Sequence, residues 1–260
     1  MLNLMKADMY RIVRGKGLYI SLALILTFVL LTLFVFRTAS MAVGVQEYRP
    51  AVTYVTSVAA SQLALDNVAG MIHIFFIPMF VVVAMAAFSS GAVKNELTVG
   101  ISRGKFYLAK FALSVLLCLL LLVFNLALSV LLALPIDGAG DWGDGHVANL
   151  LQSFGLQALV MLALVSVGIF LSFVTRKTAA TIGLFLSFVF VPSLVIAILA
   201  EAIEGAMDWL RFDLAAQLQF FSNVSLIDNA QIIRGVVLAV AFIVVPTVVG
   251  LAIFRKAEVK

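Results

Sequence analysis

The charged stretch from Lys94 to Lys110 is the first place to look for chemistry, because it separates two long apolar runs and reads KNELTVGISRGKFYLAK. Within it, the six residues that begin at Gly100 superficially resemble a phosphate-binding loop. That pattern is one residue short, and Phe106 stands where a Ser or Thr is required. The stretch also follows an apolar run and not a strand. We therefore expect no ATP site in this chain.

Other catalytic patterns are missing from the sequence. There is no HExxH pair and no GxSxG elbow. Two His and a single Cys, Cys118, make a metal site improbable and exclude a disulfide framework. A membrane lipid synthase would need clustered carboxylates at the cytoplasmic face, where the sequence offers only Asp8, Glu96 and Glu258. We expect this chain to be neither an enzyme nor the holder of a cofactor or metal.

Composition predicts the class of fold that carries the charged stretch. Hydrophobic residues make up 64% of the chain, charged residues 12%, and the mean hydropathy is +1.18. These values are typical of an integral membrane protein. Six apolar runs are long enough to cross a bilayer, and their continuous character favours helices over a β-barrel. The predicted spans are Leu18–Phe36, Met71–Val93, Phe106–Leu134, Leu150–Val174, Ala179–Ala200 and Ile232–Phe254. The prediction is an all-α integral membrane protein with one transmembrane domain, residues 1–260.

The charges between the spans predict its orientation. Thirteen Lys and Arg but three Asp and Glu fall on one side, in residues 1–17, 94–110, 175–178 and 255–260. The other side holds four Lys and Arg but ten Asp and Glu, in residues 37–70, 135–149 and 201–234. Basic loops stay inside, so both termini are predicted to be cytoplasmic. The predicted anchors at the lipid headgroups are Arg11, Arg14, Lys16, Lys110, Arg176 and Lys177.

Two segments outside the spans are predicted to lie along the membrane surface. Residues 1–17 place Leu2, Met5, Met9, Ile12 and Val13 on one side of a helix and most charges on the other. This pattern favours an interfacial elbow helix, and the alternative is a basic flank that only orients the first span. Residues 201–231 are predicted to form short amphipathic helices that cap the outer face. For the Gly- and Asp-rich stretch 137–146, a solvated turn is favoured over the alternative of a calcium site.

The interiors of the predicted spans carry no Asp, Glu, Lys or Arg. Ion-coupled transporters mark their ion path with such residues, so any uphill transport needs energy from outside the chain. Polar residues do occur, and the candidates for a substrate path are Asn125, Gln157 and His73. For Asn125 and Gln157, hydrogen bonding between helices is favoured over a place in a substrate path. For His73 an interface or hydrogen-bonding role is favoured over a proton relay.

The conformation of the charged loop can also be predicted. Lys94 to Val99 can form a short helical turn, and Gly100 suits a left-handed residue that ends it. Ser102 is a good N-cap for the following span. Residues 94–105 then present a compact knob to the cytoplasm. A plain turn between two spans is the alternative.

The loop resembles a known family. Gly91-Ala-Val-Lys94-Asn95, Gly100-Ile-Ser102-Arg103 and Tyr107-Leu-Ala-Lys110 resemble the stretch after the second span of bacterial ABC-2-type transporter permeases. Met5 to Arg11 is similar to their N-terminal elbow helix. The chain departs from the pattern at Ala92 and at Ser89-Ser90, which leaves the subfamily and the substrate open.

The resemblance implies a half-transporter in the bacterial cell membrane. Two permease chains, identical or related, would pair among membrane lipids and bind two cytoplasmic ABC ATPase subunits, which hold ATP and Mg. No nucleic-acid partner is expected. On this analogy the ATPase-coupling residues are Lys94, Asn95, Glu96, Leu97, Gly100, Ser102 and Arg103. An amphipathic export substrate is implied, a peptide first (as in antimicrobial-peptide export or immunity), and a lipid or hydrophobic drug next.

Two alternatives from other classes remain at this point. A non-transporting membrane scaffold or sensor subunit would have the same topology without needing an ATPase partner. A membrane enzyme ranks third, for want of catalytic groups.

Overall fold

The computed structural model describes residues 2–42, 56–76, 81–89, 93, 96, 98, 100–223 and 228–256. All regular structure in these residues is helical. The longer helices are α1 (Leu2–Arg14), α2 (Lys16–Ala42), α3 (Ser57–Gly70), α7 (Arg103–Asp137), α8 (His146–Thr175), α9 (Thr178–Ala200) and α11 (Asn229–Lys256). The shorter ones are η1 (Ile72–Phe76), η2 (Val81–Met85), α5 (Ala86–Ser89), η3 (Ala206–Phe212) and α10 (Leu214–Phe220).

Five of these helices are long and apolar enough to cross a membrane. They are α2, α7, α8, α9 and α11, and each contains one of the predicted spans. The fold is therefore that of an all-helical membrane protein. Their apolar runs are continuous, so burying the backbone in lipid requires the helical hydrogen bonds that they form.

The predicted span Met71–Val93 is covered only in part by the described residues. These form the 3-10 helix η1, the π-helix η2 and α5, while residues 77–80 and 90–92 lie outside the described residues. Helix α3 precedes this range: it begins at Ser57, after the N-cap Thr56, and ends where Met71 N–H donates to Asn67 O at 3.1 Å. The sequence predicts that the Ala-, Ser- and Thr-rich residues 37–70 belong to the outer side and could extend the first two spans beyond the bilayer. In the structure α3 packs against α7 and α8.

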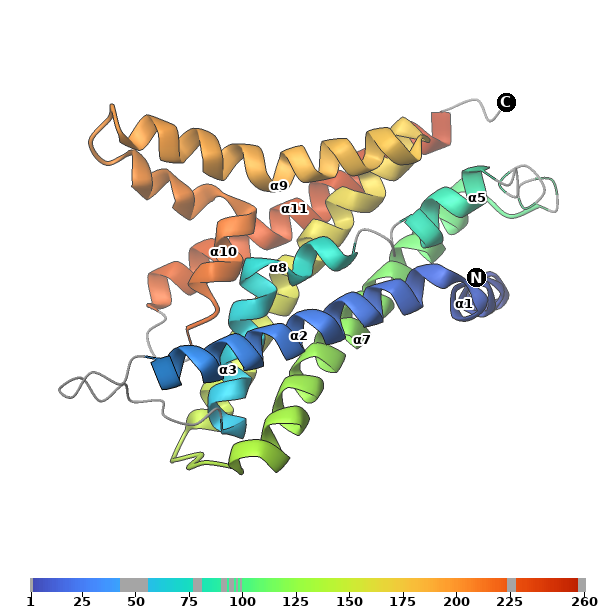
Figure 1. Ribbon diagram of the computed structural model, residues 1–260. Coiled ribbons are helices and arrows are strands. Elements are labelled where there is room, and N and C mark those ends of the chain that lie inside the picture. Colours follow the sequence, from blue (N-terminus) through green and yellow to red (C-terminus); the bar gives the residue numbers. More distant parts are fainter. Residues whose placement is uncertain are drawn as a thin grey trace.

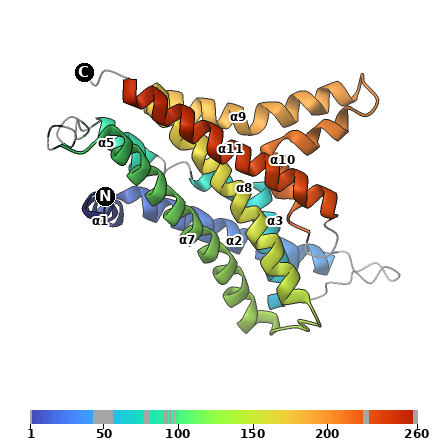
Figure 2. The ribbon, with the colours of Figure 1, turned by 180° about the vertical axis from the view of Figure 1, so that it is seen from behind.

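Helix α8 forms the centre of the bundle. It packs against α11, α7, α9, α3 and α10. Figure 1 shows α9 on one side of it and α2 on the other, and Figure 2 shows α7 and α11 from behind. In its most apolar window 61% of the residues are buried, against 11% for α9 and for α11. The outer faces of α9 and α11 are thus left to lipid or to another chain.

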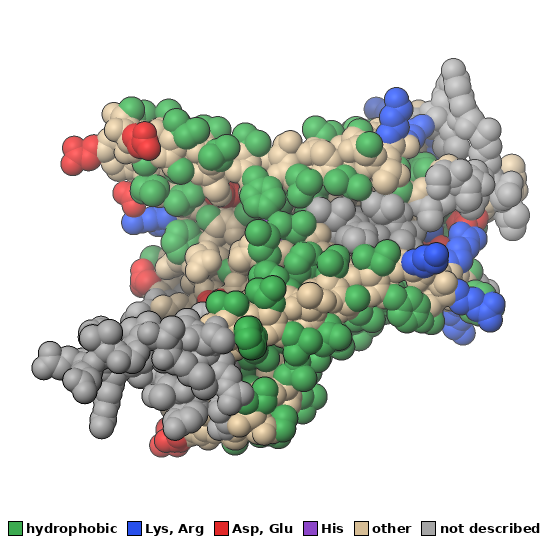
Figure 3. Space-filling view, in the orientation of Figure 1, with side chains coloured by type: hydrophobic (Ala, Val, Ile, Leu, Met, Phe, Trp, Pro, Cys, Tyr) green, Lys and Arg blue, Asp and Glu red, His purple; other side chains and the backbone are tan. Residues whose placement is uncertain are grey.

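Charge separates the two ends of the bundle. Lys and Arg gather at the end where Figure 1 marks both termini, and most Asp and Glu lie at the opposite end (Figure 3). We call these the basic end (α1 and the adjoining ends of α7, α8, α9 and α11) and the acidic end (residues 138–145, 201–213 and 228).

The segment predicted to cap the outer face contains η3 and α10. Helix α10 does not merely cover the bundle, because Leu214, Gln217 and Leu218 are buried. It packs against α8 and α3, and Asp213 caps it by accepting from Ala215 N–H at 3.1 Å. Residues 224–227 of the predicted cap lie outside the described residues.

Candidate coupling site at the basic end

The loop before α7 has the predicted bend. Gly100 adopts a left-handed φ of +92°, and Ile101 N–H donates to Glu96 O at 3.4 Å. Ser102 is the N-cap of α7, and its Oγ accepts from Lys105 N–H at 3.4 Å. Both local predictions are confirmed. Helix α7 therefore starts at a fixed point and runs uninterrupted for 35 residues.

Helix α1 is joined to this loop by a chain of ion pairs. Lys110 Nζ lies 2.7 Å from Asp8 Oδ2, and both side chains are buried. Arg11 continues the chain, at 3.7 Å from Asp8 Oδ1 and 3.6 Å from Glu96 Oε1. The first pair is the strong one, since its charges have no access to water. The Arg11 pairs are weaker because the Arg11 side chain is 52% exposed.

Lys110 is buried, whereas the sequence predicted an anchor exposed to the lipid headgroups. Its side chain is 1% exposed, and its ammonium lies 5.2 Å above the Phe106 ring. Helix α1 covers this face of α7 and brings Asp8 against it. The predicted headgroup anchor is therefore an internal contact between two elements 102 residues apart in the chain.

The other side of the loop contacts the end of α11. Arg103 Nη1 donates to Arg255 O at 2.9 Å. The next residue, Gly104, keeps the two helices close, since a Cβ there would lie 3.3 Å from Arg255 Nη2. A carbonyl in the last turn of a helix lacks a partner within the helix, so a guanidinium suits it.

An aromatic cluster underlies the loop. Phe88, Phe106, Tyr107, Phe173 and Phe254 bring together α5, α7, α8 and α11. Phe173 is at its centre, with ring centroids 4.6 Å from Tyr107 and 4.9 Å from Phe254. Edge-to-face pairs at such distances add to the burial of the rings. The cluster holds the ends of four helices in fixed relative positions.

Tyr107 fits under α11 because residue 250 is glycine. A Cβ on Gly250 would lie 2.6 Å from Tyr107 Oη, closer than atoms pack. Among the described residues the buried hydroxyl has no hydrogen-bond partner.

The structure brings together part of the predicted set of coupling residues. Glu96, Gly100, Ser102 and Arg103 lie in one continuous feature with α1 and the end of α11. Glu96 does not point freely outward, since its side chain is 14% exposed and faces Arg11. Lys94, Asn95 and Leu97 lie outside the described residues.

The remaining predicted anchors are dispersed around the basic end. Arg14 lies 4.3 Å over the Tyr10 ring, and Lys16 is exposed at the start of α2. Arg176 ends α8 with a left-handed φ of +52°, and Lys177 is the N-cap residue of α9. The connection between these two long helices is thus only two residues.

The three candidates for a substrate path each bind the backbone of α3. Asn125 Nδ2 donates to Ala64 O at 2.9 Å, and Gln157 Nε2 donates to the adjacent carbonyl, Leu65 O, at 3.0 Å. His73 Nδ1 lies 3.1 Å from Val68 O. Each side chain is buried. These hydrogen bonds support the role of the three side chains in packing between helices. They give no support to a role in a substrate path.

Sequence reasoning missed Asp8, Arg255 and the aromatic cluster. Asp8 gave one signal, as the single acidic residue in the basic segment 1–17. The partners of Arg255 and of the five rings lie far apart in the chain, so no local pattern indicates them.

These features define a helical membrane protein whose basic end carries a loop held by contacts with α1 and with the end of α11. The model of the family described as "Protein of unknown function (DUF2705)" matches residues 23–259, and the chain belongs to this family. No curated protein matches the sequence.

Proposed function

We propose that this chain is the membrane-spanning permease subunit of an ATP-driven exporter whose ATPase is a separate cytoplasmic protein. The substrate is amphipathic, a peptide first and a lipid or hydrophobic drug next. The chain works as a pair with a second permease chain in a bacterial cell membrane, with the basic end in the cytoplasm. The resemblance of the loop 94–105 to ABC-2-type permeases motivates this proposal.

The observation that supports this proposal is that contacts with neighbouring helices hold the loop in place. A slack loop would bend under a partner's motion and transmit nothing to the membrane helices. Here Arg11 of α1 pairs with Glu96 in the loop, and Arg103 at the Ser102-capped start of α7 contacts Arg255 of α11. A push on the loop therefore moves three helices together.

Helix α7 is suited to carry this displacement to the far end of the bundle. Its 35 residues have a length of about 50 Å at 1.5 Å per residue. The aromatic cluster couples its first turn to α8 and α11, so that the basic ends of the spans move as a unit. Displacement at the loop becomes a tilt of the bundle, which opens a path between two permease chains.

Affinity purification of the tagged chain from its native host tests the partner. We expect recovery of a protein with a phosphate-binding loop, and ATP hydrolysis by the complex in lipid nanodiscs that responds to the permease. Recovery of the chain alone, together with substrate movement in liposomes without ATP, would contradict the proposal.

Loop variants test the coupling. In the complex, Glu96→Gln and Arg103→Gln should each lower permease-dependent ATPase activity by about tenfold, equivalent to ~1.4 kcal/mol of coupling energy. Lys6→Gln removes an exposed charge from the same end and serves as the matched control. Unchanged activity in both loop variants would favour the scaffold or sensor alternative. Thermal unfolding of each variant separates lost coupling from lost folding.

A further inference from the structure

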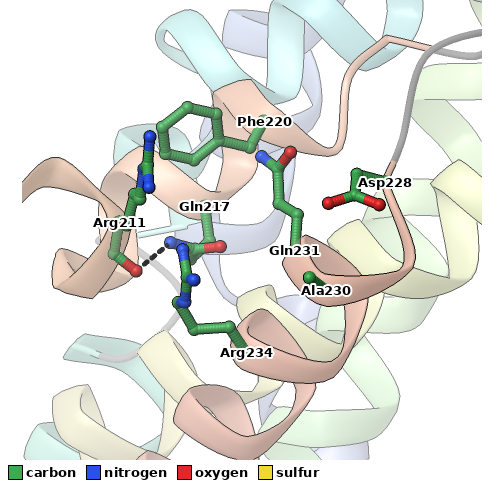
Figure 4. Close-up of a pocket in the computed structure, with 7 residues that line it drawn as sticks. All are labelled: Arg211, Gln217, Phe220, Asp228, Ala230, Gln231 and Arg234. Atoms are coloured by element: carbon green, nitrogen blue, oxygen red, sulfur yellow. Dashed lines mark hydrogen bonds between the residues drawn. The ribbon is translucent and has the colours of Figure 1, made fainter. Parts of the chain in front are cut away.

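A pocket at the acidic end lies far from the loop and is not used by the proposed function. It measures about 270 Å³ and lies between η3, α10 and the start of α11 (Figure 4). A cavity needs a volume of only ~10–15 Å³ to hold one water molecule, so this pocket has room for a larger polar group.

Two arginines from different elements line this pocket. Arg211 comes from η3 and Arg234 from the second turn of α11. Among the described residues Arg234 forms no ion pair, and its guanidinium lies 6.0 Å over the Phe212 ring. Arg211 pairs with Asp208 at 2.7 Å, but both side chains are more than half exposed. Such a surface pair is weak, so both guanidiniums are available to an oxyanion.

Gln217 is a buried polar residue in the wall of this pocket. Its side chain is 1% exposed and lines the pocket between the two arginines (Figure 4). Its Nε2 donates to Arg211 O at 2.8 Å, whereas its Oε1 has no donor among the described residues. A buried carbonyl oxygen without a donor costs free energy. This oxygen lies against α11, where a Cβ on Gly235 would be 2.9 Å from it, so Gln217 forms part of the pocket wall.

The opposite wall has the opposite charge. Asp228 and Gln231 lie across the pocket from Arg211, and Phe220 adds an apolar surface (Figure 4). Asp228 is exposed and forms no side-chain ion pair within the described residues. The pocket thus offers two cations for an oxyanion, one carboxylate for a cation, and amide groups in between.

The location indicates where such a ligand comes from. Arg234 lies six residues into α11, just before its continuous apolar run, and Trp209 on η3 is 45% exposed. Arginine and tryptophan at the end of a span are typical of headgroup depth. At this depth phospholipid headgroups surround the pocket.

We propose that this pocket binds the headgroup of a phospholipid, with the phosphate on Arg211 and Arg234. The ammonium of an ethanolamine headgroup donates to Asp228. A choline headgroup lacks the N–H donors and binds less tightly. This inference does not depend on the ATPase partner and holds for a transporter or a scaffold alike.

Trp209 provides the reporter for a test. In a Trp142→Phe background Trp209 is the remaining tryptophan, and it lies two residues from Arg211. The purified full chain in detergent is titrated with dihexanoylphosphatidylethanolamine, with the choline analogue, and with inorganic phosphate. We expect a saturable change in Trp209 fluorescence with the ethanolamine lipid and weaker binding of the choline lipid. Inorganic phosphate at equal concentration should not displace the ethanolamine lipid.

Variants identify the contacts. Arg211→Gln/Arg234→Gln should weaken binding of the ethanolamine lipid by about tenfold or more, the effect of losing a charge-assisted hydrogen bond. Asp228→Asn should abolish the preference for ethanolamine over choline. Lys6→Gln/Lys256→Gln removes two exposed charges from the basic end and is the matched control. Gel filtration confirms that each variant is folded.

Three results would overturn the proposal. The first is wild-type affinity in the double arginine variant. The second is displacement by inorganic phosphate at equal concentration, which would make this a site for free phosphate. The third is equal affinity of the wild type for the two lipids, which would remove the ethanolamine assignment. Native mass spectrometry of the lipids retained on each variant gives a second readout.

Discussion

Asp8 and Lys110 form a salt bridge where two helices cross. Each charge is buried, so each depends on the other for its interactions. A lysine near a loop in a membrane sequence is normally read as a headgroup anchor. Only the fold, which brings α1 across α7, shows that Lys110 is internal.

Removal of one partner of this pair should be costly. Asp8→Asn leaves a buried ammonium without its counter-charge, and we expect a loss of about 3–5 kcal/mol in the free energy of unfolding. The double variant Asp8→Leu/Lys110→Met should recover most of it, because no buried charge remains. Asp208→Asn, which breaks the exposed pair with Arg211, should cost less than about 1 kcal/mol. Denaturant unfolding in micelles measures all three, and a cost for Asp8→Asn as small as that of Asp208→Asn would contradict the assignment.

Gly250 and Tyr107 should be coupled energetically. Gly250→Ala places a Cβ 2.6 Å from Tyr107 Oη, and overpacking of this kind costs about 1–3 kcal/mol. Tyr107→Phe removes the hydroxyl, so the same Gly250→Ala change should cost less in that background. Gly183→Ala, where a Cβ meets nothing within 4 Å, is the control. A double-mutant cycle from thermal unfolding gives the coupling, and strict additivity would argue against the contact.

At the scale of elements, five of the six predicted spans are long helices in the structure, and the sixth, Met71–Val93, lies partly outside the described residues. Continuous apolar runs leave the backbone no option but a helix, so α2, α7, α8, α9 and α11 could be predicted. The sequence allows residues 37–70 to extend the first two spans, but it does not indicate that α3 packs inside the bundle, because Ser57, Ser61 and Asn67 are polar. In the fold neighbouring groups satisfy them: Ser57 Oγ donates to Val130 O, and Asn67 Nδ2 to Thr32 Oγ1.

The candidate site divides in the same way. Gly100 and Ser102 act through their own backbone or the next turn, so their roles could be predicted from local pattern. Asp8, Phe173 and Arg255 act through partners distant in the chain. No periodicity or spacing carries that information.

The left-handed bend at Gly100 gives a prediction for the loop as an element. Gly100→Ala meets no atom within 4 Å, so its whole effect is backbone strain at φ +92°, about 1–2 kcal/mol. We expect the variant to unfold at a lower temperature and to recover less of the ATPase in co-purification. Gly155→Ala, in the regular helix α8 with the same open surroundings, should be neutral or stabilising by up to about 1 kcal/mol. Equal behaviour of the two variants would show that Gly100 needs no left-handed conformation.

At the scale of the whole molecule, the separation of charge predicts how the bundle is inserted. In a Cys118→Ala background, Asp141→Cys at the acidic end should react with a membrane-impermeant maleimide added to intact cells. Lys256→Cys at the basic end should react only after the cells are opened. Both positions are exposed, so a difference in labelling reports sidedness and not burial. The reverse pattern would invert the proposed topology.

Gln157 has a consequence for the order in which the protein is made. Its amide donates to Leu65 O on α3 and to Leu218 O on α10, a residue synthesised 61 positions later. At about 5–20 residues per second, α10 emerges from the ribosome roughly 3–12 s after Gln157 does. During this interval α8 already sits in the membrane with one contact of its buried amide unmade. The contacts of this buried amide are therefore complete only once α10 arrives, one helix before the end of the chain, and a chain truncated before α10 should be a substrate for quality-control proteases.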